Sequence, residues 1–263
     1  MFSIYPDLTM KTLVMKFGGA SVASPENFSH IADVILARMQ EYNRIIVVVS
    51  AMAKTTDQLI QLATEVNADP PRREYDMLVS VGERISISLL AMAIAKKNRE
   101  AISFTGSQSG IITTDTHSEA RIIDIRPHRL IHGLEAGKIV IVAGFQGVSL
   151  KGEITTLGRG GSDTTAVALA VTFGAKVEFY KDVPGVYSED PKLNANAILF
   201  PRLSYKEALD IVYKGAKILH PRCIELACKN RLPLHVLSFI DAKEVGTVIS
   251  EETEDLTAPC YEE

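Results

Sequence analysis

The sequence is poor in cysteine and lacks the patterns that mark export or a membrane span. Its 263 residues include three cysteines, Cys223, Cys228 and Cys260, with no Cys-x-x-Cys pair. An odd number of isolated cysteines argues against a disulfide framework or a zinc site and favours a reducing, cytoplasmic compartment. The N-terminal residues lack a basic segment followed by an apolar one, so we expect no signal peptide. We also expect no membrane partner, because no apolar run has the length of a membrane span.

The sequence also lacks a large excess of positive or negative charge. The formal net charge is −4, and the lysines and arginines are scattered without a basic run. This argues against binding to nucleic acid or to a membrane surface. Apolar residues make up 46% of the chain and charged residues 23%, which predicts a sizeable core rather than global disorder.

The common nucleotide-binding signatures are missing as well. The nearest match to a Gly-x-x-x-x-Gly-Lys-Ser/Thr loop, residues 133–139, has the wrong spacing and ends in isoleucine. Residues 158–163 lack the last glycine of a dinucleotide fingerprint, and the protein-kinase motifs do not occur. Any phosphate chemistry therefore belongs to another class.

Apolar runs rich in valine and isoleucine alternate with helical patterns along most of the chain. Continuous runs such as 44–50 are typical of strands covered on both faces. The alternation predicts an α/β fold, a three-layer α/β/α sandwich with a mainly parallel central sheet. The predicted strands are 12–17, 44–50, 101–105, 138–144, 176–181 and 234–239, and the predicted helices are 25–39, 57–66, 72–97, 126–136, 163–173, 204–214 and 220–230.

No linker rich in proline, glycine or serine divides the chain. We expect one domain over 11–250, with an N-lobe of about 11–150 and a C-lobe of about 151–250. The last segment, 251–263, holds six acidic residues and little apolar content, so it is expected to be disordered.

The most informative segment is Leu-Gly-Arg-Gly-Gly-Ser-Asp-Thr-Thr-Ala at 157–166. Its glycines allow positive φ and close approach of the backbone to a ligand. Arg159 offers a planar fork of donors for a carboxylate or phosphate. Ser162 and Asp163 stand at a predicted helix start, which is a favourable anion site. A plain strand-to-helix turn is the alternative, but an arginine among glycines is a poor choice for one.

A second glycine pair, Gly18-Gly19, directly follows the first predicted strand. Ligands of open α/β sheets bind beyond the carboxyl ends of strands, where Lys16 can meet phosphate oxygens. The alternative is a simple turn with a surface lysine. Together with the 157–166 segment, the pair favours a function.

Other candidates are ambiguous on their own. Ser50 ends a predicted strand, and Thr55 and Thr56 lie where a helix begins. Hydroxyls there either cap the helix or hold a ligand, and capping is favoured. Gly82 within a helical pattern indicates that something approaches closely. The neighbouring Glu83 fits a substrate ammonium, or alternatively forms a solvated pair with Arg84.

The C-terminal half adds residues suited to a nucleotide. Asp182, Tyr187 and Lys192 follow the strand 176–181 and flank a Pro-Gly turn, which by itself is a common turn signal. Lys217 is able to reach phosphate. His220 precedes a proline, and we interpret it as a residue at a helix start rather than a catalytic group.

In chain order, these segments resemble the catalytic region of the aspartate kinases, within the amino acid kinase family, over about residues 11–250. Seven segments in the same order make the resemblance specific. They are residues 16–21 (KFGGAS), 50–52 (SAM), 80–83 (SVGE), 144–147 (GFQG), 156–163 (TLGRGGSD), 182–187 (DVPGVY) and 215–221 (GAKILHP).

The resemblance implies transfer of a phosphoryl group from ATP to the β-carboxylate of L-aspartate, giving 4-phospho-L-aspartate. This would be the first step towards lysine, threonine, methionine and diaminopimelate. It implies Mg²⁺ bound through the nucleotide phosphates, without protein ligands of its own. Catalysis would rest on positioning and charge neutralisation, because the carboxylate is already a nucleophile.

The resemblance also implies the roles of individual residues. Lys16 bridges the transferring phosphoryl group, Asp163 organises the phosphate-binding groups, Arg159 holds the α-carboxylate and Glu83 the α-amino group. In full, the set is Lys16 and Asp163 for catalysis; Ser50, Thr56, Glu83, Arg159, Gly160, Gly161 and Ser162 for the substrate; and Lys16, Gly18, Gly19, Ser21, Lys181, Asp182, Tyr187, Lys192 and Lys217 for the nucleotide.

The chain departs from the family at Ala20, Ala53, Lys181 and Lys192, none of which removes a catalytic group. Aspartate kinases usually continue into small-ligand-sensing (ACT) domains, whereas this sequence stops at Glu263. Either the enzyme is naturally short, with inhibition absent or supplied by a separate regulatory chain, or that part was cut away. We expect a homodimer.

Two other functions stay open. The first is a sister kinase acting on glutamate, acetylglutamate or another small acid, although Glu83 with Arg159 favours a free α-amino acid. The second is a nucleotide-binding relative without turnover, which the presence of Lys16, Arg159, Asp163 and Asp182 disfavours.

Overall fold

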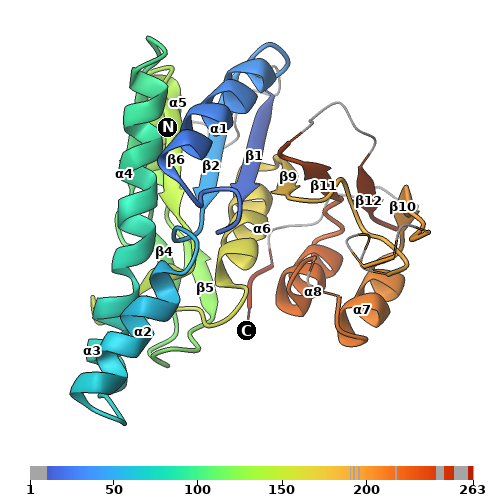
Figure 1. Ribbon diagram of the computed structural model, residues 1–263. Helices are drawn as coiled ribbons and strands as arrows, with labels where there is room; N and C mark the ends of the chain where they lie inside the picture. Colours follow the sequence, from blue (N-terminus) through green and yellow to red (C-terminus); the bar gives the residue numbers. More distant parts are fainter. Residues whose placement is uncertain are drawn as a thin grey trace.

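A computed structural model describes residues 11–189, 191, 193–194, 196–216, 218–240, 246–251 and 260–262. Its main sheet has eight strands in the order β10-β12-β11-β9-β1-β2-β6-β3 (Figure 1). Among the described strands of this sheet, β11 and β12 form the one antiparallel pair. The strands are β1 (Thr12–Phe17), β2 (Arg44–Val49), β3 (Ala101–Phe104), β6 (Ile139–Ala143), β9 (Lys176–Lys181), β10 (Arg202–Leu203), β11 (Leu234–Ser238) and β12 (Thr247–Ile249).

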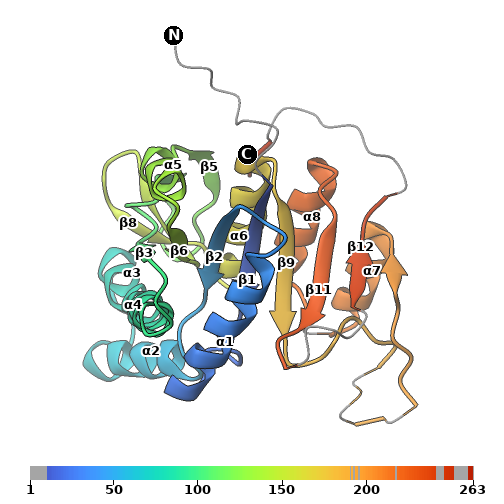
Figure 2. The same cartoon turned by 90° about the horizontal axis from the view of Figure 1, so that it is seen from above.

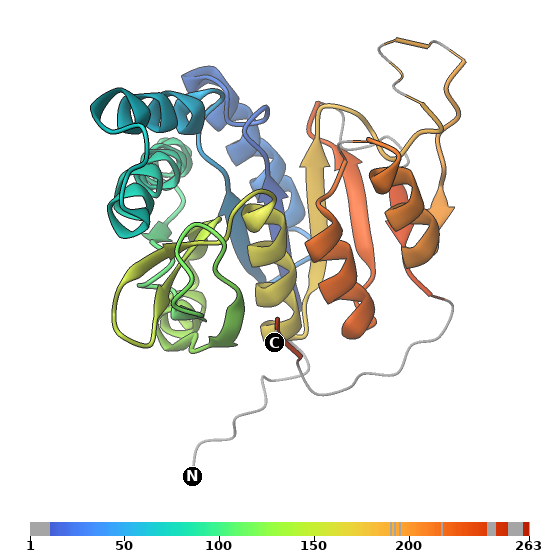
Figure 3. The same cartoon turned by 90° about the horizontal axis from the view of Figure 1, so that it is seen from below.

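Helices cover both faces of this sheet (Figures 2 and 3), which confirms the predicted three-layer α/β/α sandwich. On one face lie α1 (Pro25–Arg38) and α4 (Val81–Ala95). On the other lie α5 (His128–Glu135), α6 (Gly161–Phe173), α7 (Tyr205–Tyr213) and α8 (Pro221–Lys229).

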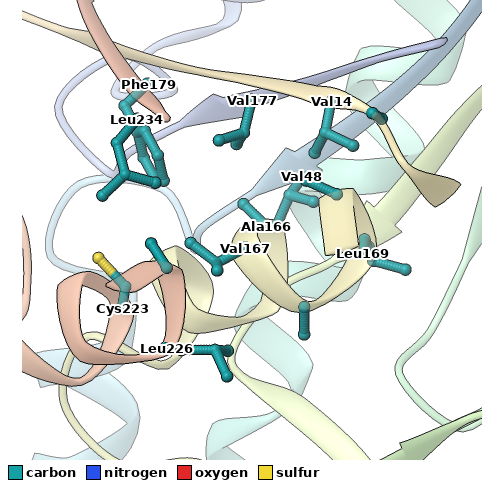
Figure 4. Packing of buried hydrophobic residues seen from close by; sticks show 14 of the residues in the cluster. Val14, Val48, Ala166, Val167, Leu169, Val177, Phe179, Cys223, Leu226 and Leu234 are labelled. Carbon is teal, nitrogen blue, oxygen red and sulfur yellow. The ribbon is translucent and has the colours of Figure 1, made fainter. Parts of the chain in front are cut away.

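The alternation of side chains along β1 decides which layer each residue meets. Leu13, Met15 and Phe17 pack with α1 and α4. Val14 points the other way and packs with α6 and α8, as Figure 4 shows beside Val48. Lys16 has the same parity as Val14, so its side chain faces α6.

A second sheet of four strands, in the order β5-β4-β7-β8, lies beside α6 (Figure 3). Its strands are β4 (Ile111–Thr113), β5 (Ile122–Ile125), β7 (Gln146–Ser149) and β8 (Ile154–Thr156). The sequence analysis missed this sheet and also β10 and β12. These strands have only two to four residues, too few for a clear alternating pattern.

The single helix predicted over 72–97 is in fact two, α3 (Arg72–Val79) and α4, which meet at Ser80. Gly82 lies where α4 crosses the end of β2, and a Cβ on it would be 2.7 Å from the Ala51 Cβ. The prediction that Gly82 marks a close approach is therefore confirmed. A further helix, α2 (Thr55–Val66), precedes this pair.

By length and hydropathy, Arg72–Ala95 is one stretch that could cross a membrane, contrary to the expectation from sequence. In the structure 44% of that window is buried, and α4 packs against α1, β3 and β6. The stretch is weak evidence for a span, because a core helix passes the same test.

Of the tail expected to be disordered, 252–259 and 263 lie outside the described residues. Residues 260–262 differ from that expectation, because they pack against the body next to α6 (Figure 1). The Cys260 N–H donates to Asn230 Oδ1 and the Asn230 amide donates back to the Cys260 carbonyl, both at 2.8 Å. The Tyr261 hydroxyl lies 3.0 Å from Thr172 Oγ1.

Candidate active site

An open cleft of about 1380 Å³ lies where β1 and β2 end and α6 and α8 begin. This is the carboxyl edge of a parallel sheet, where α/β proteins bind their ligands. The structure brings many of the predicted site residues together here. They are Lys16, Gly19, Ser50, Thr56, Glu83, Arg159, Gly160, Gly161, Ser162 and Asp163.

A buried ion pair lies at the base of the cleft. Lys16 Nζ is 2.5 Å from Asp163 Oδ1, with side-chain exposures of 6% and 8%. Lys181 Nζ, at the end of β9, is 3.8 Å from Asp163 Oδ2. Lys16 is therefore not the surface lysine of the alternative interpretation. Buried charges of this kind persist only when they are paired.

The charge state of Asp163 follows from these neighbours. Burial alone would raise the pKa of Asp163, but the positive charges of Lys16 and Lys181 and a hydrogen bond from the His220 main chain lower it. Burial is likewise the largest influence on Lys181, whose pKa is lowered. Asp163 is therefore held as the carboxylate, and the two lysine side chains beside it form a site that suits a phosphate.

The glycine-rich segment forms the start of α6. The helix begins at Gly161 with Gly160 as N-cap, earlier than the predicted start at Asp163. Gly158 and Gly160 have φ of +73° and +71°, the left-handed region that glycine tolerates. Ser162 and Asp163 lie in the first turn, so the positive end of the helix faces the cleft.

Glu83 lies on the opposite wall in the first turn of α4. It is 3% exposed, so the alternative of a solvated pair with Arg84 is wrong. Its Oε1 accepts the Ala51 N–H at 2.9 Å, while its Oε2 is buried without a partner. Burial raises the pKa of Glu83 to about 8, although the Ala51 N–H and Lys16 act against the shift. Such an orphaned acceptor is costly unless a ligand satisfies it.

The remaining predicted substrate residues frame the space between these walls. Ser50 follows β2, and Thr56 lies within the first turn of α2. The N-cap of α2 is Lys54, with no side-chain capping bond, so the capping role favoured for Thr56 is wrong. Arg159 is exposed at the rim.

The predicted nucleotide residues are more dispersed. Gly18 adjoins Lys16, because a Cβ on it would be 3.4 Å from Lys16 Nζ. Ser21 is buried, and its hydroxyl donates to the Tyr180 carbonyl at 3.2 Å, which is a structural contact. Asp182 is exposed just after β9, and Tyr187 forms an isolated bridge with Leu199. Lys192 and Lys217 lie outside the described residues.

His220 supports the site without facing it as a free base. It is the N-cap of α8, and its Nδ1 accepts the Arg222 N–H. Burial and the charge of Arg222 lower its pKa. A Cβ on Gly160 would be 2.1 Å from the His220 Cγ, so the ring lies directly against the glycine backbone. The interpretation as a residue at a helix start is confirmed.

Sequence reasoning missed Asp76, a fully buried carboxylate of α3 that organises one rim of the cleft. It accepts hydrogen bonds from the main chain and hydroxyl of both Ser118 and Thr156, and it pairs with His117 Nδ1 at 2.8 Å. His117, Ser118 and Thr156 line the cleft. A lone acid on a helix gives no signal of such a role.

Within the described ranges, no group of three or more His, Cys, Asp or Glu side chains is arranged to hold a metal ion. The site therefore consists of a buried cationic cluster at a helix N-terminus, opposite a buried carboxylate. In an α/β protein, this combination suits an anion at the lysine side of the cleft and a cationic group at the Glu83 side.

The chain belongs to the amino acid kinase family, whose model matches residues 11–238. Curated relatives include the aspartokinases of Geobacillus stearothermophilus, 49% identical over 244 residues, and Mycolicibacterium smegmatis, 48% identical over 249 residues. These matches cover 92% and 94% of this chain but 60% and 59% of the relatives. The chain thus spans about 60% of the length of the curated relatives it matches.

Solved structures agree with this assignment. The aspartate kinase from Synechocystis has a TM-score of 0.84 at 44% identity, covering 96% of this chain and 42% of that one. E. coli aspartokinase III, in complex with aspartate and ADP, has a TM-score of 0.83 at 28% identity, covering 93% of this chain and 66% of that one.

Proposed function

We propose that this chain is the catalytic region of an aspartate kinase, with one catalytic domain over about 11–250. It would transfer the γ-phosphoryl group of ATP to the β-carboxylate of L-aspartate, giving ADP and 4-phospho-L-aspartate. The curated relatives named aspartokinase and the E. coli structure that holds aspartate and ADP support this assignment.

One observation carries the proposal: the unpartnered Glu83 Oε2 and the Lys16–Asp163 pair border the same cleft. A buried carboxylate oxygen is a natural partner for an α-ammonium group. Arg159 at the rim supplies a fork of donors for the α-carboxylate. A substrate held in this way by its α-ammonium and α-carboxylate groups would extend its β-carboxylate, at the other end of the molecule, towards Lys16.

The transfer itself needs little proton chemistry. An oxygen of the β-carboxylate attacks the γ-phosphorus, and the bond to the bridging oxygen breaks, with its electron pair remaining on ADP. The difficulty is to bring one anion to another, so catalysis rests on in-line positioning and charge neutralisation. Lys16, Lys181 and the N-terminus of α6 would neutralise the transferring group.

Mg²⁺ fits this site as an ion carried by the nucleotide. Asp163 is already paired with Lys16 and Lys181, and the described residues offer no cluster of acids for a protein cage. Mg²⁺ is commonly held through substrate phosphates with few protein ligands. When bound, it would neutralise charge on the β- and γ-phosphates.

The wider context is part of the proposal. The product would enter lysine, threonine, methionine and diaminopimelate synthesis in the cytoplasm. An exposed apolar row on α4, Val81, Ile85 and Met92, supports a homodimer. A separate regulatory chain would be a further partner.

The test is an ATP/Mg²⁺ assay with hydroxylamine trapping that compares L-aspartate, L-glutamate and N-acetylglutamate. Trapping by hydroxylamine reports an acyl phosphate directly. An aspartate-specific hydroxamate that disappears in Lys16→Ala and Asp163→Ala supports the proposal. ATP binding without hydroxamate from any acid would contradict it, and equal yields from glutamate would favour a sister kinase.

A further inference from the structure

Three residues near the C-terminus, Cys260–Glu262, are fixed to the body at several points; we call them the C-terminal strap. Besides the contacts of Cys260 and Tyr261, the Glu262 N–H donates to the Ile122 carbonyl at 2.9 Å, and the Ile122 N–H donates to Glu262 Oε2 at 3.0 Å. The strap therefore joins the edge of β5. The mechanism above uses none of these residues.

The carboxylate of the strap holds one arginine that borders the cleft. Arg222 Nε donates to Glu262 Oε1 at 2.8 Å, and Arg222 Nη2 donates to Glu262 Oε2 at 2.9 Å. The side chains are only 25% and 11% exposed. A bidentate, largely buried pair of this kind fixes the plane of the guanidinium.

The other donors of Arg222 reach two walls of the cleft. Nη1 donates to the carbonyl of Leu157, the first residue of the glycine-rich segment, and Nη2 donates to the Ala120 carbonyl at 3.0 Å. These walls touch each other, because a Cβ on Gly158 would lie 3.0 Å from the Ser118 carbonyl oxygen. The Arg222 guanidinium thus fixes two parts of the cleft relative to each other: the glycine-rich segment, which carries Arg159, and the rim, which carries Ser118.

We propose that the C-terminal strap positions the amino-acid side of the cleft through Arg222, so that Glu262 and Arg222 are positioning residues for the acceptor substrate. The inference rests on the proposed function. Without the Glu262 carboxylate, Arg222 loses the partner that orients its guanidinium. Its hydrogen bonds to the Leu157 and Ala120 carbonyls are then weakened. The nucleotide side is held separately, since Lys16 and Lys181 stand on β1 and β9.

The test compares Glu262→Gln and Arg222→Gln with the unaltered 263-residue chain. Glu262→Gln should raise KM for aspartate about tenfold, the scale of one lost charge-assisted hydrogen bond. KM for ATP should change less than about twofold. Arg222→Gln should act in the same direction, and the double variant should be no worse than Arg222→Gln alone, because both changes break one link.

A matched control breaks a different partly exposed ion pair. Asp33→Asn removes the partner of Lys97, 2.6 Å away, on the face of the sheet that carries α1 and α4. It should leave KM for aspartate unchanged. A second readout is amide hydrogen exchange of residues 157–161, which should speed up in Glu262→Gln while exchange in β1 and β9 stays the same.

The outcomes separate the strap from the proposed function. If the unaltered chain phosphorylates aspartate but Glu262→Gln leaves both KM for aspartate and exchange at 157–161 unchanged, the positioning role is wrong. If KM for ATP rises equally, the strap is a general stabiliser and the inference is also wrong. If the unaltered chain has no kinase activity, the proposed function fails, and the exchange measurement still decides whether the strap fixes the segment.

Discussion

Lys16 and Asp163 place opposite charges 2.5 Å apart at the base of the cleft, where each side chain is less than a tenth exposed. The pair forms because the Lys16 side chain points to the face of the main sheet that α6 covers. Since α6 begins at Gly161, Asp163 lies in its first turn, at the carboxyl edge where Lys16 lies near the end of β1. Lys181 lies on the far side of Asp163. Two lysine side chains thus lie beside one carboxylate, and a phosphoryl group would accept from the ammonium donors that Asp163 does not use.

Lys16→Met should lower kcat for aspartate phosphorylation by about 10² to 10³-fold, the range seen when one donor that stabilises transition-state charge is removed. The measurement is hydroxamate formation at saturating ATP and aspartate. Lys138→Met is the matched control, since Lys138 forms an exposed pair with Glu100 and should leave kcat unaltered. Retention of more than about a tenth of kcat in Lys16→Met would remove Lys16 from the reaction centre.

Glu83 should make the affinity for aspartate depend on pH. Its pKa is raised to about 8 by burial, so at pH 6.5 the empty site holds mostly the neutral acid, which cannot pair with an ammonium. KM for aspartate should therefore fall as pH rises from 6.5 to 8.5, by up to about tenfold per unit of pH below the pKa. In Glu83→Gln the KM should be higher at pH 8.5 and nearly independent of pH. A pH profile shared by both proteins would assign the titration to another group.

The Glu83 carboxyl group should also lower the stability of the folded protein at pH values above the pKa that Glu83 has in the unfolded chain. Because folding raises the pKa of Glu83 from 4.5 to about 8, its contribution to stability is fully present below pH 4.5 and is lost as pH rises towards 8. Glu83→Gln should then melt above the unaltered protein at pH 8 and at the same temperature at pH 4. Calorimetric scans at the two pH values measure the difference in melting temperature between the two proteins. The same difference at pH 4 and pH 8 would contradict the argument.

The sequence was informative where a pattern is local. The valine-rich strands and the glycine pairs predicted the main sheet and its carboxyl edge, and Gly82 predicted a close approach that Ala51 provides. Three-residue strands such as β4 carry no such pattern, so the second sheet was missed. The roles of Asp76 and Arg222 depend on partners far away in sequence, at Thr156 and Glu262, and no spacing rule indicates those.

Asp76→Asn should disturb the rim of the cleft although it preserves size. The Ser118 and Thr156 groups that contact the Asp76 carboxylate all act as donors, through two main-chain N–H groups and two hydroxyls. An amide NH₂ in place of one oxygen would face donors, leaving buried groups unsatisfied at a cost of about 1–3 kcal/mol. We expect a lower melting temperature and a higher KM for aspartate. Asp124→Asn, which breaks an exposed pair with Arg126, should change neither, and an Asp76→Asn protein that behaves like this control would rule out the organising role.

Gly160→Ala should destabilise the site through a steric clash as well as through backbone strain, and Gly152→Ala provides a comparison that has the strain alone. Gly160 has φ +71°, and its added Cβ would be 2.1 Å from the His220 Cγ, whereas Gly152 has φ +84° and open space around it. Gly152→Ala therefore suffers only the left-handed penalty of about 1–2 kcal/mol. Gly160→Ala should lose more stability than that and most of its activity, because His220 and the start of α6 must move apart. The added Cβ would also be 2.2 Å from the His220 Cβ, which alanine keeps. Combining Gly160→Ala with His220→Gly should therefore recover part of the lost stability, whereas His220→Ala should not. Equal melting temperatures for Gly160→Ala and Gly152→Ala would show that the His220 ring does not constrain the segment.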